Sequence, residues 1–221
     1  MKQALVIGAS GGIGSALCSE LTAQGWQVTG LSRSVHGLDV TDEASIVQHL
    51  GAMKGPFQRI IIATGALEIA GYAPEKALKH LTGEGMALQF ALNTIGPALV
   101  MKHAVALLPR DAPCVMAALS ARVGSIGDNR AGGWHSYRAA KAALNQIIRG
   151  AAIELGRSHK QAVCVALHPG TVATSFTEKY LGRHPAVPAP DAAANLLQVI
   201  DRLGPEESGQ FFDWAGKAVA W

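Results

Sequence analysis

Apolar and polar positions along the chain follow two different patterns. Short runs rich in apolar and β-branched residues are typical of strands buried in a sheet, and they predict strands at 3–8, 26–32, 59–65, 112–120, 161–170 and 209–216. Between them, apolar positions recur about every three to four residues, which predicts helices at 12–25, 43–53, 84–108, 136–157 and 190–203. This alternation predicts one α/β domain over residues 1–221, a doubly wound parallel sheet (Rossmann fold) with helices on both faces.

Composition argues against several classes of protein. Hydrophobic residues make up 49% of the 221 residues and charged residues 16%, which suits a large core. The net charge of +3 comes without a long basic run, so we expect no nucleic-acid partner. No apolar run approaches the roughly 18–20 residues needed to cross a bilayer, so we expect no membrane span.

The cysteines, the histidines and the start of the chain bear on metals and location. The three cysteines and eight histidines show no metal-ligand spacing, and we expect no metal. Scattered cysteines in apolar surroundings are typical of buried thiols in a reducing compartment. The start, "MKQALVIGASGGIG", does not have the form of a secretory signal. We therefore expect a cytoplasmic protein.

A glycine-rich turn, "VIGASGGIG" (6–14), joins the first predicted strand to the first predicted helix. Glycine permits a tight turn and lets a pyrophosphate approach the backbone, while the helix start offers free N–H groups. The alternative is a flexible turn with no ligand. We favour a dinucleotide site, which would use Gly8, Ser10, Gly12, Ile13 and Gly14.

The end of the second predicted strand bears on the choice of dinucleotide. An acid there would bind the ribose 2′-hydroxyl of NAD(H), but the segment "GLSRSVHG" has none. It offers Ser32 and Arg33 instead, and a guanidinium suits the 2′-phosphate of NADP(H). A solvated arginine is the alternative, and we favour NADP(H) over NAD(H). Asp39 is expected near the adenine ring or in an Asx turn, beside Val40.

The segment "SYRAAKAAL" (136–144) places a phenol and an ammonium one helical turn apart. Tyr137 and Lys141 share a face with Leu144 and Ile148, which are core positions. A lysine in the first turns of a helix opposes the helix dipole and needs another reason to be there. An ammonium can lower the pKa of a nearby phenol, which suits acid–base chemistry. The alternative is a half-buried tyrosine beside a lysine that extends to water.

Six motifs in order make the whole chain resemble the short-chain dehydrogenase/reductase family. They are "GASGGIG" at 8–14, "LDV" at 38–40, "ATGA" at 63–66, "NTIG" at 93–96, "YRAAK" at 137–141 and "HPGTVAT" at 168–174. The segment "GSIGDNRAGGW" and the ending "GQFFDWAGKAVAW" are most similar to the C-factor and sniffer-like carbonyl reductases of that family.

The resemblance implies roles for individual residues. Tyr137 would be the general acid/base, Lys141 would lower its pKa and hold the nicotinamide ribose, and Asn93 would hold a water of a proton relay. A serine would bind the substrate carbonyl. Besides Tyr137 and Lys141, the cofactor would be contacted by Ala63, Thr64, Gly65, Pro169, Gly170, Val172 and Thr174.

Three positions depart from the family pattern. Ile7 stands where a threonine is common, and "ATGA" replaces Asn-Asn-Ala-Gly. Counted back from Gly124, the family's two serines fall on Ser120 and Ala121. We therefore take Ser120 as the first candidate for the catalytic serine and Ser125 as the second.

The residues and the resemblance together predict an NADPH-dependent carbonyl reductase or alcohol dehydrogenase acting on a small carbonyl or hydroxyl compound. The alternative is an NAD(P)-binding signalling protein of the C-factor type with weak or no turnover. Asn93, Tyr137 and Lys141 would be dispensable in such a protein, which favours the enzyme.

Two further expectations concern the substrate and the assembly. The segments 122–135 and 174–190 should form the substrate pocket, with Trp134, Phe176 and Tyr180 favouring an apolar or aromatic substrate. The resemblance also implies a homodimer or homotetramer, formed through the helices predicted at 84–108 and 136–157.

Overall fold

The central sheet has six parallel strands in the order β2-β1-β3-β4-β5-β8. The computed structural model describes residues 1–174, 177, 179–180 and 186–221. The strands are β1 (Gln3–Ile7), β2 (Gln27–Leu31), β3 (Arg59–Ile62), β4 (Cys114–Leu119), β5 (Ala162–His168) and β8 (Phe211–Asp213). The chain reverses its direction of travel across the sheet between β1 and β3, and ligands bind at such a point in open α/β sheets.

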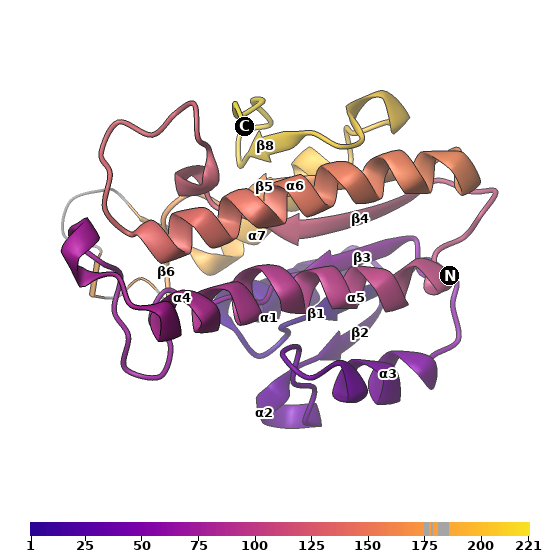
Figure 1. The fold of residues 1–221 in the computed structure, drawn as a ribbon. Helices are drawn as coiled ribbons and strands as arrows, with labels where there is room; N and C mark the ends of the chain where they lie inside the picture. Colours follow the sequence, from indigo (N-terminus) through magenta and orange to yellow (C-terminus); the bar gives the residue numbers. More distant parts are fainter. Residues whose placement is uncertain (175–176, 178, 181–185) are drawn as a thin grey trace.

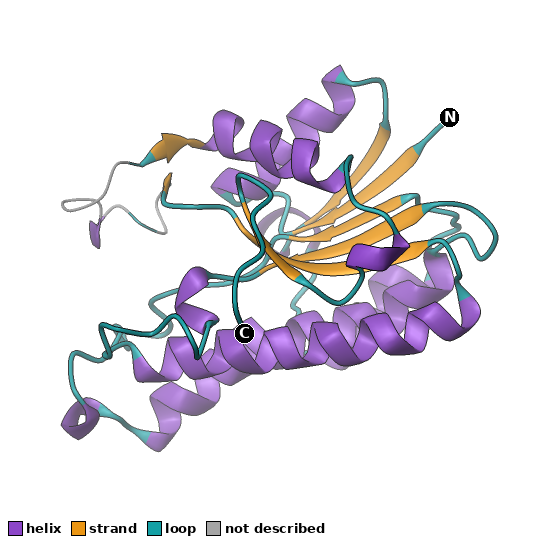
Figure 2. Cartoon of the chain, turned by 90° about the horizontal axis from the view of Figure 1, so that it is seen from above, coloured by secondary structure: helices purple, strands orange, loops and turns teal. Residues whose placement is uncertain are grey.

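Helices cover both faces of this sheet, which confirms the predicted fold class (Figures 1 and 2). One face packs against α1 (Gly12–Ala23) and α7 (Ala189–Ile200), and the other against α3 (Glu43–Gly51), α5 (Gly96–Ala104) and α6 (His135–Ser158). The central strands β1, β3, β4 and β5 are mostly apolar because their alternate side chains enter two separate cores. Figure 1 shows α4 (Gly83–Phe90) and α5 running side by side with α6.

The helix predicted at 84–108 is interrupted near its middle. A π-helical turn, Ala91–Ile95, separates α4 from α5, and Val105–Leu107 form a final 3₁₀ turn. Asparagine is a poor interior helix residue, and the π turn falls on Asn93, where a local distortion is expected.

Mean hydropathy singles out this interrupted helix, although no continuous apolar run in it is long enough to cross a bilayer. Over Gly83–Leu107 it has 25 residues and a mean hydropathy of 1.3 in its most apolar window, enough by length and composition to cross a bilayer. The mean stays high although polar residues break every long apolar run. Val100, Met101 and Ala104 belong to the core of the domain, and the helix packs along α6. It is thus the core helix of this fold.

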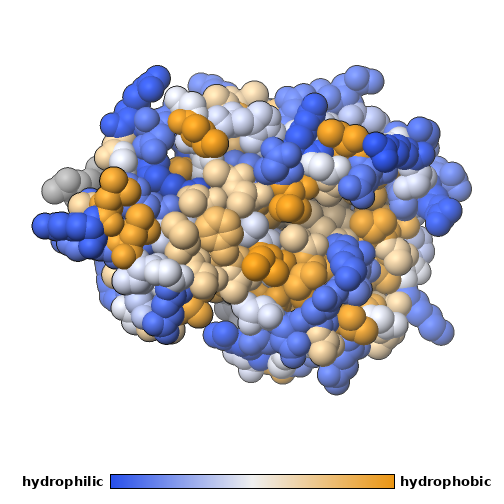
Figure 3. All heavy atoms as spheres, viewed as in Figure 1, coloured by the Kyte–Doolittle hydropathy of each residue, from blue (hydrophilic) through white to orange (hydrophobic). Residues whose placement is uncertain are grey.

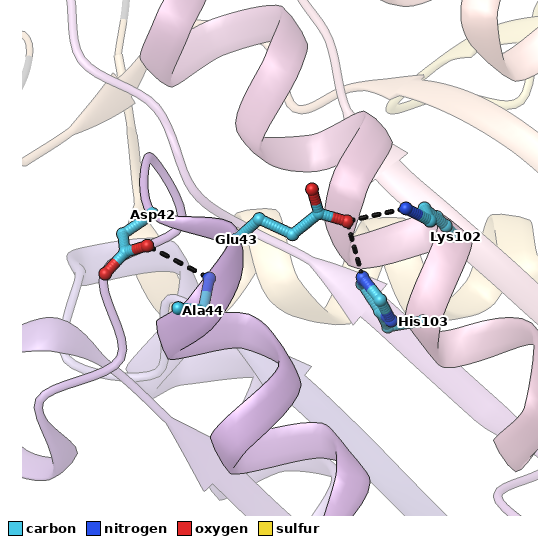
Figure 4. A network of polar contacts seen from close by, with 5 residues as sticks. All are labelled: Asp42, Glu43, Ala44, Lys102 and His103. Atoms are coloured by element: carbon cyan, nitrogen blue, oxygen red, sulfur yellow. Dashed lines mark hydrogen bonds and ion pairs between the residues drawn. The ribbon is translucent and has the colours of Figure 1, made fainter.

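The segment between β2 and α3 differs from its prediction. Residues 33–36 form a short helix, α2 (Arg33–His36), which was not predicted, and residues 38–42 contain a turn. Asp42 caps α3 by accepting a hydrogen bond from the Ala44 N–H at 2.9 Å. The next residue, Glu43, accepts from Lys102 Nζ at 2.6 Å and lies 2.9 Å from His103 Nε2, joining α3 to α5 (Figure 4).

Two short elements flank the part of the chain outside the described residues. β6 (Val172–Ala173) and β7 (Val187–Pro188) pair in parallel beside the carboxyl end of β5. Phe176, predicted to line the substrate pocket, lies outside the described residues. The last strand, Phe211–Asp213, is shorter than the range 209–216 predicted for it.

Candidate active site

The glycine turn packs tightly between the ends of β2 and β3. Gly8 has φ 92°, and a Cβ there would lie 2.8 Å from the carbonyl carbon of Ala63. A Cβ at Gly14 would lie 2.1 Å from the carbonyl oxygen of Gly8. Side chains therefore do not fit at either position. The N-cap residue of α1, Gly11, places no side chain over the helix start, and its N–H groups can meet an anion.

The segment after β5 reaches back to this turn. The position that a Cβ would take at Gly12 lies 2.5 Å from the Cγ2 atom of Thr174. Two segments predicted to bind the cofactor, 8–14 and 168–174, therefore lie against each other. A Cβ at Gly170, which has φ 80°, would lie 3.0 Å from the Cδ1 atom of Trp214, and Val172 is buried in β6.

Thr64 contributes a polar group beside the glycine turn. Its Oγ1 atom is buried and has no hydrogen-bond partner among the described residues. It follows Ala63, whose backbone contacts Gly8. A buried hydroxyl without a hydrogen-bond partner is rare, and a ribose hydroxyl of a bound dinucleotide could be the partner of Thr64 Oγ1. Together with the glycines, this atom gives the site features that fit a dinucleotide.

The segment predicted to bind the adenosine end has its own hydrogen bonds. Arg33 is exposed at the start of α2, and Ser32 donates from its backbone N–H to His36 Nδ1 at 3.2 Å. Asp39 accepts from the Thr41 N–H at 2.9 Å and from the Thr41 hydroxyl at 2.7 Å, so it forms the Asx turn given as one alternative. These hydrogen bonds lower the pKa of Asp39. Val40 is buried beneath the segment.

Tyr137 and Lys141 lie together on α6, and both are buried. Lys141 Nζ is 5.9 Å from the centroid of the Tyr137 ring and donates a hydrogen bond to the Leu119 carbonyl oxygen at 2.9 Å. Burial raises the pKa of the Tyr137 phenol and lowers the pKa of Lys141 to about 7. The sequence predicted the opposite direction for Tyr137. Desolvation of the phenolate outweighs the ammonium here, because Lys141 is itself desolvated.

Asn93 fixes the backbone that follows β3. It is fully buried, its Nδ2 donates to the Ala66 carbonyl at 2.9 Å, and its Oδ1 accepts from the Ala66 N–H at 3.2 Å. The position of a Cβ at Gly65 lies 2.8 Å from Asn93 Oδ1 and 3.5 Å from Lys141 Nζ. Gly65, Asn93 and Lys141 therefore converge, as three separate motifs predicted.

Gln89 is a buried residue of the site that the sequence analysis missed. Its Oε1 accepts from Asn93 Nδ2 at 2.7 Å, and its Nε2 donates to the Leu67 carbonyl at 2.8 Å. The signal was present, because a glutamine one turn before a functional asparagine shares its helix face.

Both candidate serines are engaged elsewhere. Ser120 Oγ donates to Asn145 Oδ1 on α6 at 2.6 Å, and Ser125 Oγ accepts from the Asp128 N–H at 3.1 Å. Ala121 follows Ser120 with an extended backbone, φ −144° and ψ 144°. Successive residues of extended chain point to opposite sides, so Ala121 faces away from α6 while Ser120 faces toward it.

Trp134 joins Tyr137 to a second aromatic residue. The Trp134 ring meets Tyr137 edge-on at 6.4 Å and Tyr180 edge-on at 5.5 Å between centroids. The Tyr180 hydroxyl donates to Glu68 at 2.7 Å. Of the predicted aromatic residues, Trp134 therefore lies beside the predicted catalytic tyrosine, and Tyr180 lies beside Trp134. Among the residues that the structure describes, no cluster of His, Cys, Asp and Glu could hold a metal ion.

Comparison with known proteins agrees with this geometry. Residues 8–202 match the model of a family described as Enoyl-(Acyl carrier protein) reductase. The chain belongs to the short-chain dehydrogenase/reductase family. The protein is thus an oxidoreductase by family, and the predicted resemblance is confirmed.

Two relatives of this chain have names that point to different functions. The C-signal of Myxococcus xanthus is 39% identical over 145 residues, covering 66% of this chain and 84% of the relative. A 1-hydroxy-2-glutathionyl-2-methyl-3-butene dehydrogenase of Rhodococcus sp. (strain AD45) is 31% identical over the full length of both chains.

Solved structures share the fold. The carbonyl reductase Sniffer of D. melanogaster has a TM-score of 0.80 with 18% identity, and each chain is covered over 100% of its length. The NADPH-bound carbonyl reductase from chicken fatty liver has a TM-score of 0.81 with 25% identity, covering 100% of this chain and 94% of that chain.

Proposed function

We propose that the protein is an NADPH-dependent carbonyl reductase that acts on small apolar or aromatic carbonyl compounds. The observation that carries this proposal is the convergence of Gly65, Asn93 and Lys141 on the face of α6 that also carries Tyr137. A protein that only binds the cofactor could use Lys141 to hold a ribose, but it has no need for the phenol of Tyr137 beside it. The NADP(H)-bound relatives of known structure support the choice of cofactor.

Tyr137 is suited to donate a proton. Burial raises the pKa of its phenol, so the hydroxyl keeps its proton at neutral pH. When bound, the reduced nicotinamide supplies a hydride to the carbonyl carbon. Tyr137 Oη then gives its proton to the carbonyl oxygen, the π electron pair of the C=O bond becomes the new O–H bond, and the phenolate remains to be reprotonated.

Lys141 is suited to restore that proton. Its pKa, lowered to about 7 by burial, lets the ammonium release and regain a proton near neutrality. The hydrogen bond to Leu119 holds Nζ at the end of β4. A charged Lys141 also stabilises the phenolate that the reaction leaves behind.

Residues of the chain are available to bind each part of the cofactor. The glycine turn and the start of α1 would hold the pyrophosphate, and Thr64 and Lys141 would bind ribose hydroxyls. Arg33, with Ser32, would bind the 2′-phosphate. Thr174, Pro169 and Gly170 would close the nicotinamide end, since Thr174 already lies against Gly12.

A panel of aldehydes, ketones and quinones tests the proposal directly. We expect at least one of these compounds to be reduced with oxidation of NADPH. The rate with NADPH should exceed the rate with NADH. NADPH binding without turnover on any member of the panel would contradict it. Because the Rhodococcus relative is named a dehydrogenase, the panel should include alcohols with NADP⁺.

A signalling protein that binds the cofactor without turnover is the second candidate. It is favoured by the likeness to C-signal and by the Ser120 hydroxyl, which donates to Asn145 instead of facing a substrate. The same panel separates the two candidates, because such a protein would bind NADPH and leave it unoxidised.

We further propose that the protein acts in the cytoplasm as a homodimer or homotetramer. Its three cysteines are free, as in a reducing compartment. Figure 3 shows apolar side chains gathered over the helices α4, α5 and α6. Ile95, Ile147 and Ile153 lie on these helices with 49%, 41% and 51% of their surface exposed. Sedimentation or light scattering would test the assembly, and a monomer would contradict it.

A further inference from the structure

The first turn of α6 is held by a residue from a distant loop. Trp134 precedes the helix with φ 49° and ψ 39°, and no side chain of the helix's own N-terminus caps it. Glu75 supplies the acceptors instead. Its backbone oxygen accepts from the Trp134 N–H at 2.5 Å, its Oε2 accepts from the Ser136 N–H at 3.2 Å, and its Oε1 accepts from the Ser136 hydroxyl. These bonds satisfy donors that a helix start leaves open.

The charge of Glu75 also suits this place. A carboxylate is favoured at the N-terminus of a helix, and the first turn of α6 contains no acid of its own. Burial acts to raise the pKa of Glu75, but the hydrogen bonds from Ser136 outweigh it, and the pKa is lowered. The side chain is therefore ionised at neutral pH and held to Ser136, which is 2% exposed.

The residues that Glu75 holds are those beside Tyr137. Ser136 directly precedes Tyr137, and the ring of Trp134 contacts the Tyr137 ring edge-on. A small cavity of about 20 Å³ is lined by both Glu75 and Tyr137, with Gln89 of α4 on its wall. Glu75 thus acts on Tyr137 through Ser136, its neighbour in sequence, and through Trp134, whose ring contacts it, without belonging to the helix.

We propose that Glu75 is a positioning residue of the reductase reaction, which rests on the proposed function: by fixing the first turn of α6 it sets the place of the Tyr137 hydroxyl. The phenol must lie within hydrogen-bond distance of the substrate oxygen, and a displacement of about 1 Å can cost on the order of 100-fold in rate. Ser136 links Glu75 to Tyr137, because it donates both hydrogen bonds that the Glu75 carboxylate accepts.

Glu75→Ala, Glu75→Gln and the control Glu43→Ala test this inference. The carboxylate of Glu43 also holds a distant helix by hydrogen bonds, but it joins α3 to α5, away from Tyr137. We expect Glu75→Ala to lower kcat about 10-fold to 100-fold with little change in the Kd of NADPH. Glu75→Gln should recover most of kcat, because an amide can accept from the Ser136 N–H and donate to its hydroxyl. Glu43→Ala should keep the wild-type kcat.

A double-mutant cycle separates positioning from general destabilisation. If Glu75 acts through Ser136, the effects of Glu75→Ala and Ser136→Ala on kcat should not add, while circular dichroism shows folded proteins. Additive effects, or a wild-type kcat in Glu75→Ala, would overturn the inference and leave the proposed function intact. An active Tyr137→Phe variant would overturn the proposed function itself.

Discussion

Lys141 donates a hydrogen bond from Nζ to the carbonyl oxygen of Leu119 at 2.9 Å, which fixes a buried ammonium at the end of β4. The same atom lies 5.9 Å from the centre of the Tyr137 ring. An ammonium with one backbone partner in an apolar environment is costly to keep charged, and its pKa falls to about 7. This arrangement links stability to pH.

Lys141→Met should remove part of the pH dependence of stability. The unfolded lysine titrates near pH 10.4, so between about pH 7 and pH 10 the unfolded state binds more protons than the folded state. The contribution of Lys141 to stability therefore rises with pH across this window. Urea unfolding at several pH values should show a smaller rise in the variant than in the wild type. Equal slopes would contradict the burial of a titrating Lys141.

Arg33→Glu should reverse the preference between the two cofactors. The substitution replaces a guanidinium that suits the 2′-phosphate by a carboxylate that repels it and can bind the ribose hydroxyls. Tryptophan fluorescence quenching should show tighter binding of NADH than of NADPH in the variant. Arg157→Glu makes the same change of charge in the last turn of α6 and should leave the preference unaltered. An unchanged preference in Arg33→Glu would remove the assignment of Arg33.

Ala121→Ser and Ser120→Ala should act in opposite ways. A hydroxyl at position 121 would restore the second serine of the family pattern and should raise kcat/KM about 10-fold by binding the substrate oxygen. Ser120→Ala removes the hydrogen bond to Asn145 and should cost about 1 kcal/mol of stability with activity retained. Loss of activity in Ser120→Ala with an unchanged Tm would restore Ser120 as the catalytic serine.

Gly14→Ala should disrupt the cofactor turn. The new Cβ would lie 2.1 Å from the Gly8 carbonyl oxygen, so the backbone must move. We expect NADPH affinity to fall at least about 10-fold, since the backbone must approach the pyrophosphate closely. Gly156→Ala is the matched control, because its Cβ meets nothing within 4 Å in α6. That control should stabilise the protein by about 0.5–1 kcal/mol and leave affinity unchanged.

The fold was predictable because its strands are buried on both faces. Continuous apolar runs such as "RIII" in β3 have few alternatives in an α/β chain, and the glycine turn marks the first crossover. The helix carrying Tyr137 was predicted to within a residue or two of its ends. The turn at 38–42 and the short helix Arg33–His36 were not predicted, since hydrogen bonds across the segment form them.

The chemistry of the site was less predictable. The spacing placed Tyr137 and Lys141 on one face, but the direction of the Tyr137 pKa depends on burial, which is set by the whole domain. Motif order put Ser120 near the substrate, yet the face of extended chain on which it lies turns it to Asn145. The hydrogen bonds of Asn93 to Ala66 and of Ser136 to Glu75 join distant segments and leave no local pattern.

Tyr137→Phe tests the central claim most directly. The variant keeps the ring that packs against Trp134 and loses only the hydroxyl that would protonate the carbonyl oxygen. With a carbonyl compound that the wild type reduces, we expect NADPH oxidation to fall by at least about 100-fold, while the Kd of NADPH stays within about twofold. Wild-type turnover in this variant would contradict the account.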